Sequence, residues 1–171
     1  VHTAFQDSTP MILFVGDVGS DFRHREAFQE VDFAAMFAPL AKWAARIDDV
    51  ARIPEYLNRA FTVAMSGRRG PVVLALPEDL LTATAAVADA GPYAPVHAEP
   101  GAVELERLRV LLAGARRPLV VLGGSGWTRE ACNDVQRWAE ANQVPVGCAF
   151  RFQDLFDNNH PNYVGDVGIG I

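Results

Sequence analysis

The chain has 171 residues, half of them hydrophobic, which is enough for one or two small domains with a buried core. Its formal net charge is −6, and the charges of both signs are interspersed, which indicates a soluble protein and excludes the basic surface that nucleic-acid binding needs. The longest apolar runs, such as 72–77 and 119–122, are far too short to cross a bilayer, so we expect no membrane partner.

In the first half, strands and a helix alternate. Residues 11–15 form a continuous apolar run ending at Gly16-Asp17, which is typical of a strand buried on both faces of a parallel sheet. A helix is predicted next, with Pro54 in its first turn and Gly67 as its stop. Its apolar residues repeat at helical spacing: Ile53, Leu57, Phe61 and Ala64. Residues 71–76 are predicted to form the next buried strand.

Residues 82–100 are rich in Ala, Pro and Gly without periodicity, which predicts a linker between domains. The following elements are a leucine-faced helix (Leu105, Leu108, Leu111, Leu112) ending near Gly114, a strand 118–122, a helix 128–142 and a strand 144–150. This alternation predicts an α/β fold with parallel sheets flanked by helices. It is Rossmann-like and divided into two partial domains, 1–81 and 101–171.

A glycine turn, Gly123-Gly124-Ser125-Gly126, separates the strand 118–122 from the next helix. Glycines there allow a ligand to approach the backbone, and free N–H groups at a helix start favour an anion. The spacing fails the dinucleotide fingerprint, because no third glycine follows and Arg151 stands where an acid is expected. A nucleotide site of another geometry and a purely structural turn both remain open.

Phe28 and Gln29 form a second candidate site. A flat apolar ring and an amide that both donates and accepts could orient a polar substrate beside a cofactor and exclude water. The structural alternative is a Phe in the core and a Gln on a helix edge. The nearby carboxylates of Glu26, Glu30 and Asp32 are expected to be solvated or paired with neighbouring arginines.

The cysteines and histidines predict no metal site. Cys132 and Cys148 lie in a predicted helix and a predicted strand without a CxxC motif, so we expect two buried thiols in a reducing, cytoplasmic compartment. The four histidines lack the spacing of helical metal ligands. His160 lies in a polar stretch, 157–168, that could cap a ligand or simply form turns.

Four ordered segments resemble the thiamine-diphosphate enzymes of the acetolactate synthase type. Asp7-Ser8-Thr9-Pro10 is similar to the family's D-S-x-P, and residues 27–32 match its A-F-Q-E-x-D segment. Residues 67–79 resemble its G-R-x-G-P-V…P-x-D close, and residues 118–126 resemble the opening strand and glycine turn of its central domain. Two positions depart from the branched-chain synthases, which commonly have Lys where Glu78 stands and Gln where Asp17 stands.

The resemblance implies the second half of a pyrimidine-binding domain at 1–81 and the first part of a central domain at 101–171. It implies a lyase or carboligase (transferase) acting on 2-oxo acids, with Phe28 and Gln29 lining the substrate side of the cofactor pocket. Thiamine diphosphate and Mg²⁺ would be bound in a longer parent, with their ligands outside these residues. Gly123, Gly124 and Gly126 would contact a nucleotide, FAD or ADP, where one is bound.

A homodimer or homotetramer is implied as well, because the family's cofactor pocket lies between subunits. The isolated chain is expected to be inactive. The alternative from another class is a non-catalytic module that binds a nucleotide or serves only as structure.

Overall fold

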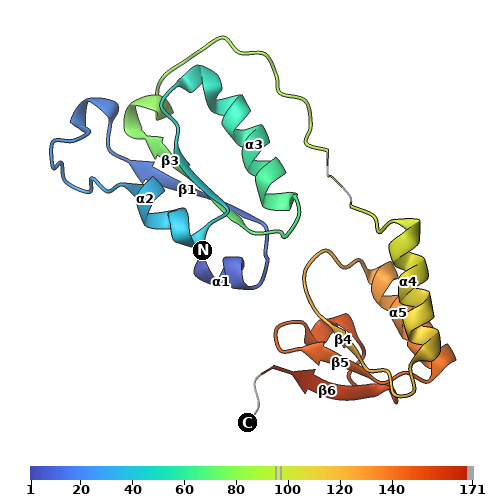
Figure 1. The fold of residues 1–171 in the computed structure, drawn as a ribbon. Coiled ribbons are helices and arrows are strands. Elements are labelled where there is room, and N and C mark those ends of the chain that lie inside the picture. The colour runs from blue at the N-terminus through green and yellow to red at the C-terminus, as the bar shows by residue number, and fades with distance from the viewer. Residues whose placement is uncertain (95, 97, 169–171) are drawn as a thin grey trace. The chain divides into compact units, whose positions relative to one another are not determined.

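The computed structural model describes residues 1–94, 96 and 98–168. The chain divides into two compact units, residues 1–97 and 98–171, and each contains its own three-stranded parallel sheet with helices packed against it (Figure 1). The predicted α/β class with parallel sheets is confirmed. Pro95 and His97 of the predicted linker and residues 169–171 of the predicted second domain lie outside the described residues.

The sheet of the first unit has the strand order β1-β3-β2. Its strands are β1 (Met11–Asp17), β2 (Trp43–Arg46) and β3 (Pro71–Pro77). The central strand β3 is buried almost throughout, as its apolar run predicted. The prediction that the first strand is buried on both faces was wrong, because β1 is an edge strand and leaves Phe14 49% exposed. The short strand β2 was not predicted.

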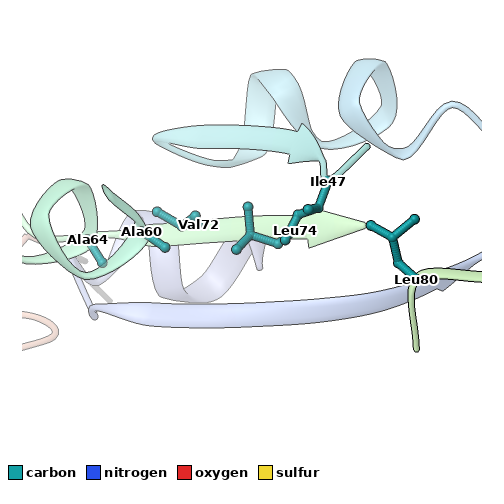
Figure 2. Packing of buried hydrophobic residues seen from close by; sticks show 6 residues of the cluster. All are labelled: Ile47, Ala60, Ala64, Val72, Leu74 and Leu80. Atoms are coloured by element: carbon teal, nitrogen blue, oxygen red, sulfur yellow. The ribbon is translucent and has the colours of Figure 1, made fainter. Parts of the chain in front are cut away.

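The core of this unit lies between the sheet and α3 (Ile53–Met65), the helix that the spacing predicted. Val72 and Leu74 of β3 pack with Ala60 and Ala64 of α3, and Ile47 completes the layer (Figure 2). Two further helices are short: α1 (His2–Gln6) and α2 (Phe33–Phe37). The 3₁₀ helices among the described residues are η1 (Ser20–Phe22), η2 (Ala38–Leu40), η3 (Val50–Arg52), η4 (Glu78–Leu81) and η5 (Gln153–Leu155).

In the second unit the strand order is β4-β5-β6. Its elements are α4 (Ala102–Gly114), β4 (Val120–Leu122), α5 (Arg129–Asn142), β5 (Val146–Ala149) and β6 (Tyr163–Val167). Leu122, Val146 and Cys148 pack with Ala139 of α5 to form the core. Cys132 is only half-buried, so the expectation of two buried thiols holds for Cys148 alone.

The leucine-faced helix α4 was predicted correctly as a helix, but none of its residues is buried. Leu105 and Leu108 are each 51% exposed, and Leu111 is 64% exposed. Among the described residues, this apolar surface therefore has no extensive packing partner.

The stretch around His160 follows η5 and leads into strand β6. The Nε2 atom of His160 lies 2.7 Å from Oε1 of Glu140, and its Nδ1 accepts a hydrogen bond from the backbone N–H of Asn162 at 3.1 Å. The Asn162 side chain donates to the carbonyls of Ala139 and Val144. These bonds fix the start of β6, a strand that the Asn- and Gly-containing sequence did not predict.

The middle of the predicted linker 82–100 lies against helix α3. The side chain of Asn58 donates to the carbonyl of Gly91 at 3.4 Å, and the Tyr93 ring stacks on Phe61 with centroids 6.5 Å apart. Residues 83–94 form no helix or strand, as the composition predicted. Gly91 and Tyr93, near the end of this stretch, are nevertheless packed against α3.

Candidate functional site

A pocket of about 580 Å³ opens at the carboxyl ends of β1 and β3. Gly16 and Asp17 come from the end of β1, and Leu76 and Glu78 from the end of β3 and the start of η4. The carboxyl ends of parallel strands are the usual place for ligands in open α/β sheets. The geometry therefore makes this pocket the strongest candidate site of the first unit.

Both predicted residues of the first unit line this pocket. Phe28 and Gln29 lie in the loop that connects β1 to α2, and that loop brings them beside Leu76, which is far away in sequence. Phe28 is 89% exposed, so the alternative that placed it in the core is wrong. Gln29 has φ of 67°, so it lies in the left-handed region and not on a helix edge. The pair is thus presented to solvent and to the pocket.

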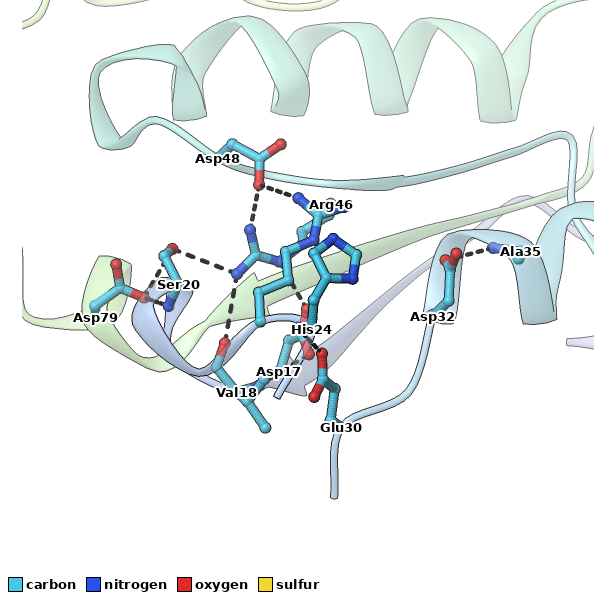
Figure 3. A network of polar contacts seen from close by, with 11 residues as sticks. Asp17, Val18, Ser20, His24, Glu30, Asp32, Ala35, Arg46, Asp48 and Asp79 are labelled. Carbon is cyan, nitrogen blue, oxygen red and sulfur yellow. Dashed lines mark hydrogen bonds and ion pairs between the residues drawn. The ribbon is translucent and has the colours of Figure 1, made fainter. Parts of the chain in front are cut away.

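A buried ion pair holds the start of this loop (Figure 3). The Nε atom of Arg46 lies 2.8 Å from Oδ2 of Asp17, and the two side chains are 11% and 7% exposed. Arg46 also donates to the Val18 carbonyl at 3.4 Å and to Oγ of Ser20 at 3.3 Å. Its guanidinium therefore ties β2 to the first residues after β1.

Arg46 stays positively charged in this position. Burial acts to lower the pKa of Arg46, but hydrogen bonds with Asp17 and Asp48 outweigh burial and raise the pKa above its ordinary value. The other oxygen of Asp17 accepts from the Val18 backbone N–H at 2.8 Å. Both carboxylate oxygens of Asp17 are thereby occupied, and its charge is compensated inside the protein.

Three further carboxylates bind backbone N–H groups of the loop region. Asp79 accepts from the Ser20 N–H at 2.9 Å, which holds the pKa of Asp79 below its ordinary value. Glu30 accepts from the N–H groups of His24 and of Ala27, the latter at 3.0 Å, and these bonds lower the pKa of Glu30.

Asp32 caps α2 through the Ala35 N–H at 2.9 Å (Figure 3). Glu30 and Asp32 were expected to be solvated or paired with neighbouring arginines. Asp32 is exposed, and both carboxylates bind backbone N–H groups, which stabilise carboxylates well. Sequence reasoning missed Ser20, Arg46 and Asp79 as supports of the site. Only the position of Asp17 at a strand end signalled such a role.

The first glycine of the turn in the second unit has two close neighbours within the chain. The indole N–H of Trp127 donates to the Gly123 carbonyl at 3.0 Å. A Cβ atom on Gly123 would lie 3.1 Å from the Cβ of Ala149, so close packing against β5 explains this glycine. Gly124 and Gly126 have φ of 78° and 99°, values that favour glycine.

The pocket next to this turn is separate from the three glycines. It measures about 370 Å³ and is lined by Trp127, Thr128 and residues of α5 on one side and by Asp154 to Asp157 of the η5 region on the other. Thr128 caps α5 by accepting from the Ala131 N–H at 3.1 Å. The nucleotide role of Gly123, Gly124 and Gly126 stays a prediction, because their conformations have structural reasons of their own.

Within residues 1–94, 96 and 98–168, no three His, Cys, Asp or Glu side chains gather in a way that could hold a metal ion. In the same part of the chain, no helix is long and apolar enough to cross a membrane.

Comparison with known proteins gives a consistent family. Residues 105–171 match the thiamine pyrophosphate enzyme central domain. The chain is 30% identical to the acetolactate synthase of Arthrospira platensis, over 98% of this chain and 30% of that protein. It is 31% identical to the probable acetolactate synthase large subunit of Methanocaldococcus jannaschii, over 99% of this chain and 30% of that protein.

A glyoxylate carboligase of Escherichia coli O157:H7 is 31% identical over 99% of this chain and 29% of that protein. The chain thus spans about 30% of the length of these curated relatives.

Proposed function

Since the chain belongs to the thiamine-diphosphate enzyme family, we propose that it forms part of a lyase or carboligase acting on 2-oxo acids. The observation that carries the proposal is the convergence of Phe28, Gln29 and Glu78 in one pocket at the carboxyl ends of β1 and β3. Gln29 supports it further, because its left-handed backbone costs roughly 1–3 kcal/mol, and such strain clusters at functional sites.

Thiamine diphosphate supplies the electron sink of this chemistry when it is bound. The pocket fits one side of such a cofactor, since Phe28 offers a flat apolar face and Gln29 an amide. Phe28 would exclude water from the reacting face, and Gln29 would orient the carboxylate or carbonyl of the 2-oxo acid by hydrogen bonds. The described residues contain no carboxylate cluster for Mg²⁺, so other parts of the enzyme would hold the metal and the diphosphate.

The remaining features of the proposal follow from the family. The enzyme would act as a homodimer or homotetramer in the cytoplasm. FAD or ADP would be bound, where it is bound at all, beside Gly123, Gly124 and Gly126. The isolated chain would be inactive toward 2-oxo acids.

The test is the change Gln29→Ala in the full-length protein. If the amide orients the substrate, kcat for 2-oxo acid decarboxylation should fall about 10- to 100-fold, because misplacement of reacting groups costs factors of this size. The melting temperature should stay within about 2 °C, since Gln29 is exposed and surface changes have small effects on stability.

Gln153→Ala, an exposed glutamine of the second unit, is the matched control and should leave kcat unchanged. An unaltered kcat in Gln29→Ala would contradict the proposed role of the amide and indicate that Gln29 has only a structural role.

A further inference from the structure

The pocket beside Phe28 and Gln29 carries one uncompensated charge. Its only ionisable lining residues are Asp17 and Glu78, and no Lys, Arg or His lines it in the part of the chain that the structure describes. Asp17 is nearly buried and bonded to Arg46 and the Val18 N–H. Glu78 is exposed and makes no hydrogen bond or ion pair among the described residues.

Exposed aromatic rings share this pocket with the carboxylate. Phe22 is 52% exposed and Phe28 is 89% exposed, and both line it. An aromatic face attracts ammonium and guanidinium groups through its quadrupole, and an unpaired carboxylate attracts them by charge. The amide oxygen of Gln29 adds a neutral acceptor. Together these groups suit an organic cation beside Glu78, and the Glu78 carboxylate repels an anion from that side of the pocket.

We propose that this pocket selects a ligand bearing an ammonium or guanidinium group, and that Glu78 is the residue that determines this preference. This inference rests on the proposed function. The substrate class is then a 2-oxo acid with a cationic side chain, or an acceptor that carries one. The cationic end lies toward Glu78 and the aromatic rings, because the ligand's own carboxylate would be repelled there.

The position of Glu78 in the fold supports a selective role. It is the first residue of η4, directly after the buried end of β3, so its backbone is held by the central strand of the sheet. Its neighbour Asp79 is bonded to Ser20, which ties η4 to the loop that carries the aromatic residues. The carboxylate and the rings are therefore attached to a common support.

The experiment is a titration of the ¹⁵N-labelled 171-residue chain followed by amide chemical shifts. The probe is butylguanidinium, with butanoate and 1-butanol as matched anionic and neutral probes. Butylguanidinium should shift the amides of Phe28, Gln29 and Glu78 and saturate, whereas butanoate should not. Equal shifts with butanol, or stronger binding of butanoate, would overturn the proposal.

Variants then identify the groups responsible. Glu78→Gln keeps the shape of the side chain and should weaken butylguanidinium binding about tenfold, because a charged partner is replaced by a neutral one. Phe28→Leu should weaken it roughly threefold through the lost aromatic face. Glu99→Gln, an exposed glutamate of the second unit, is the control and should bind like the parent chain. Unchanged affinity in Glu78→Gln would refute the role of this residue.

The titration needs neither cofactor nor turnover. Its failure would remove the cation preference and leave the proposed reaction standing. If the full-length protein did not act on 2-oxo acids but the titration succeeded, the proposed reaction would be refuted. The cation preference of the pocket would still stand.

Discussion

The two units differ in the loop that follows the first strand of each parallel sheet. In each, a loop follows the first strand of a parallel sheet at the edge where ligands usually bind. After β1 the loop is long, and carboxylates and Arg46 hold it open over a pocket. After β4 the turn is short, and Trp127 bonds back onto Gly123. The same place in the fold thus holds a pocket in one unit and, in the other, a turn in which a tryptophan bonds to the first glycine.

The loop after β1 and the turn after β4 also differ in backbone conformation. The loop after β1 has three non-glycine residues with positive φ, namely His24, Glu26 and Gln29. The turn after β4 reaches positive φ only at Gly124 and Gly126 within the described residues. Positive φ is cheap for glycine and costly for other residues, so the first loop depends on its side-chain contacts far more than the second.

The largest expected effect is therefore the loss of Arg46. Arg46→Met should destabilise the first unit by about 3–5 kcal/mol, because it leaves the buried carboxylate of Asp17 unpaired. Urea unfolding followed by amide signals of β3 measures this effect. Arg109→Met removes an exposed pair with Glu106 and should cost at most about 1 kcal/mol.

If the buried pair is the cause, adding Asp17→Asn to Arg46→Met should recover part of the lost stability. A loss below about 1 kcal/mol in the single variant would mean that the loop is not held by this pair.

The second prediction concerns the packed turn. Gly123→Ala should destabilise the second unit by about 1–3 kcal/mol, since the new methyl group would lie 3.1 Å from the Cβ of Ala149. Gly114→Ala is the matched control at the end of α4, where a Cβ atom would meet nothing within 4 Å. It should be neutral or stabilising. Unfolding monitored through amides of β5 distinguishes the two, and equal effects would contradict the packing explanation.

Much of the fold could be predicted from the sequence, because periodicity and glycine or proline stops report local structure directly. The central strand β3 and the helices α3 and α5 follow from such patterns. β2 is short, and β6 contains Gly165 in a left-handed conformation, so neither carries a strand pattern. Their pairing with β3 and β5 is decided by tertiary contacts.

The candidate site was predictable only in part. Phe28 and Gln29 were found through the resemblance of residues 27–32 to a known segment, not through any physical signal of exposure. The bond between Asp79 and Ser20 spans 59 positions, and the pair of Arg46 with Asp17 spans 29. Contacts between such distant residues depend on strand order, which local patterns do not encode.

The smallest expected effect is a response to acid that distinguishes the loop from the turn. The pKa values of Asp79 and Glu30 are lowered by bonds from backbone N–H groups, so both carboxylates stabilise the loop in their charged form. This stabilisation is complete above their ordinary values of 3.8 and 4.5 and is lost as pH falls through the lower folded values. The Ser20 and Ala27 amide signals should therefore shift together as the pH is lowered below about 4.

Asp79→Asn keeps an oxygen acceptor but cannot titrate. In this variant the Ser20 amide should lose its acid-dependent shift while Ala27, which faces Glu30, keeps its own. The Gly123 and Ala131 amides of the second unit serve as internal references, because Ala131 donates to a threonine hydroxyl rather than to a carboxylate. If those amides moved over the same pH range as Ser20, the transition would be global, and the loop would not depend on its carboxylates in the way the structure indicates.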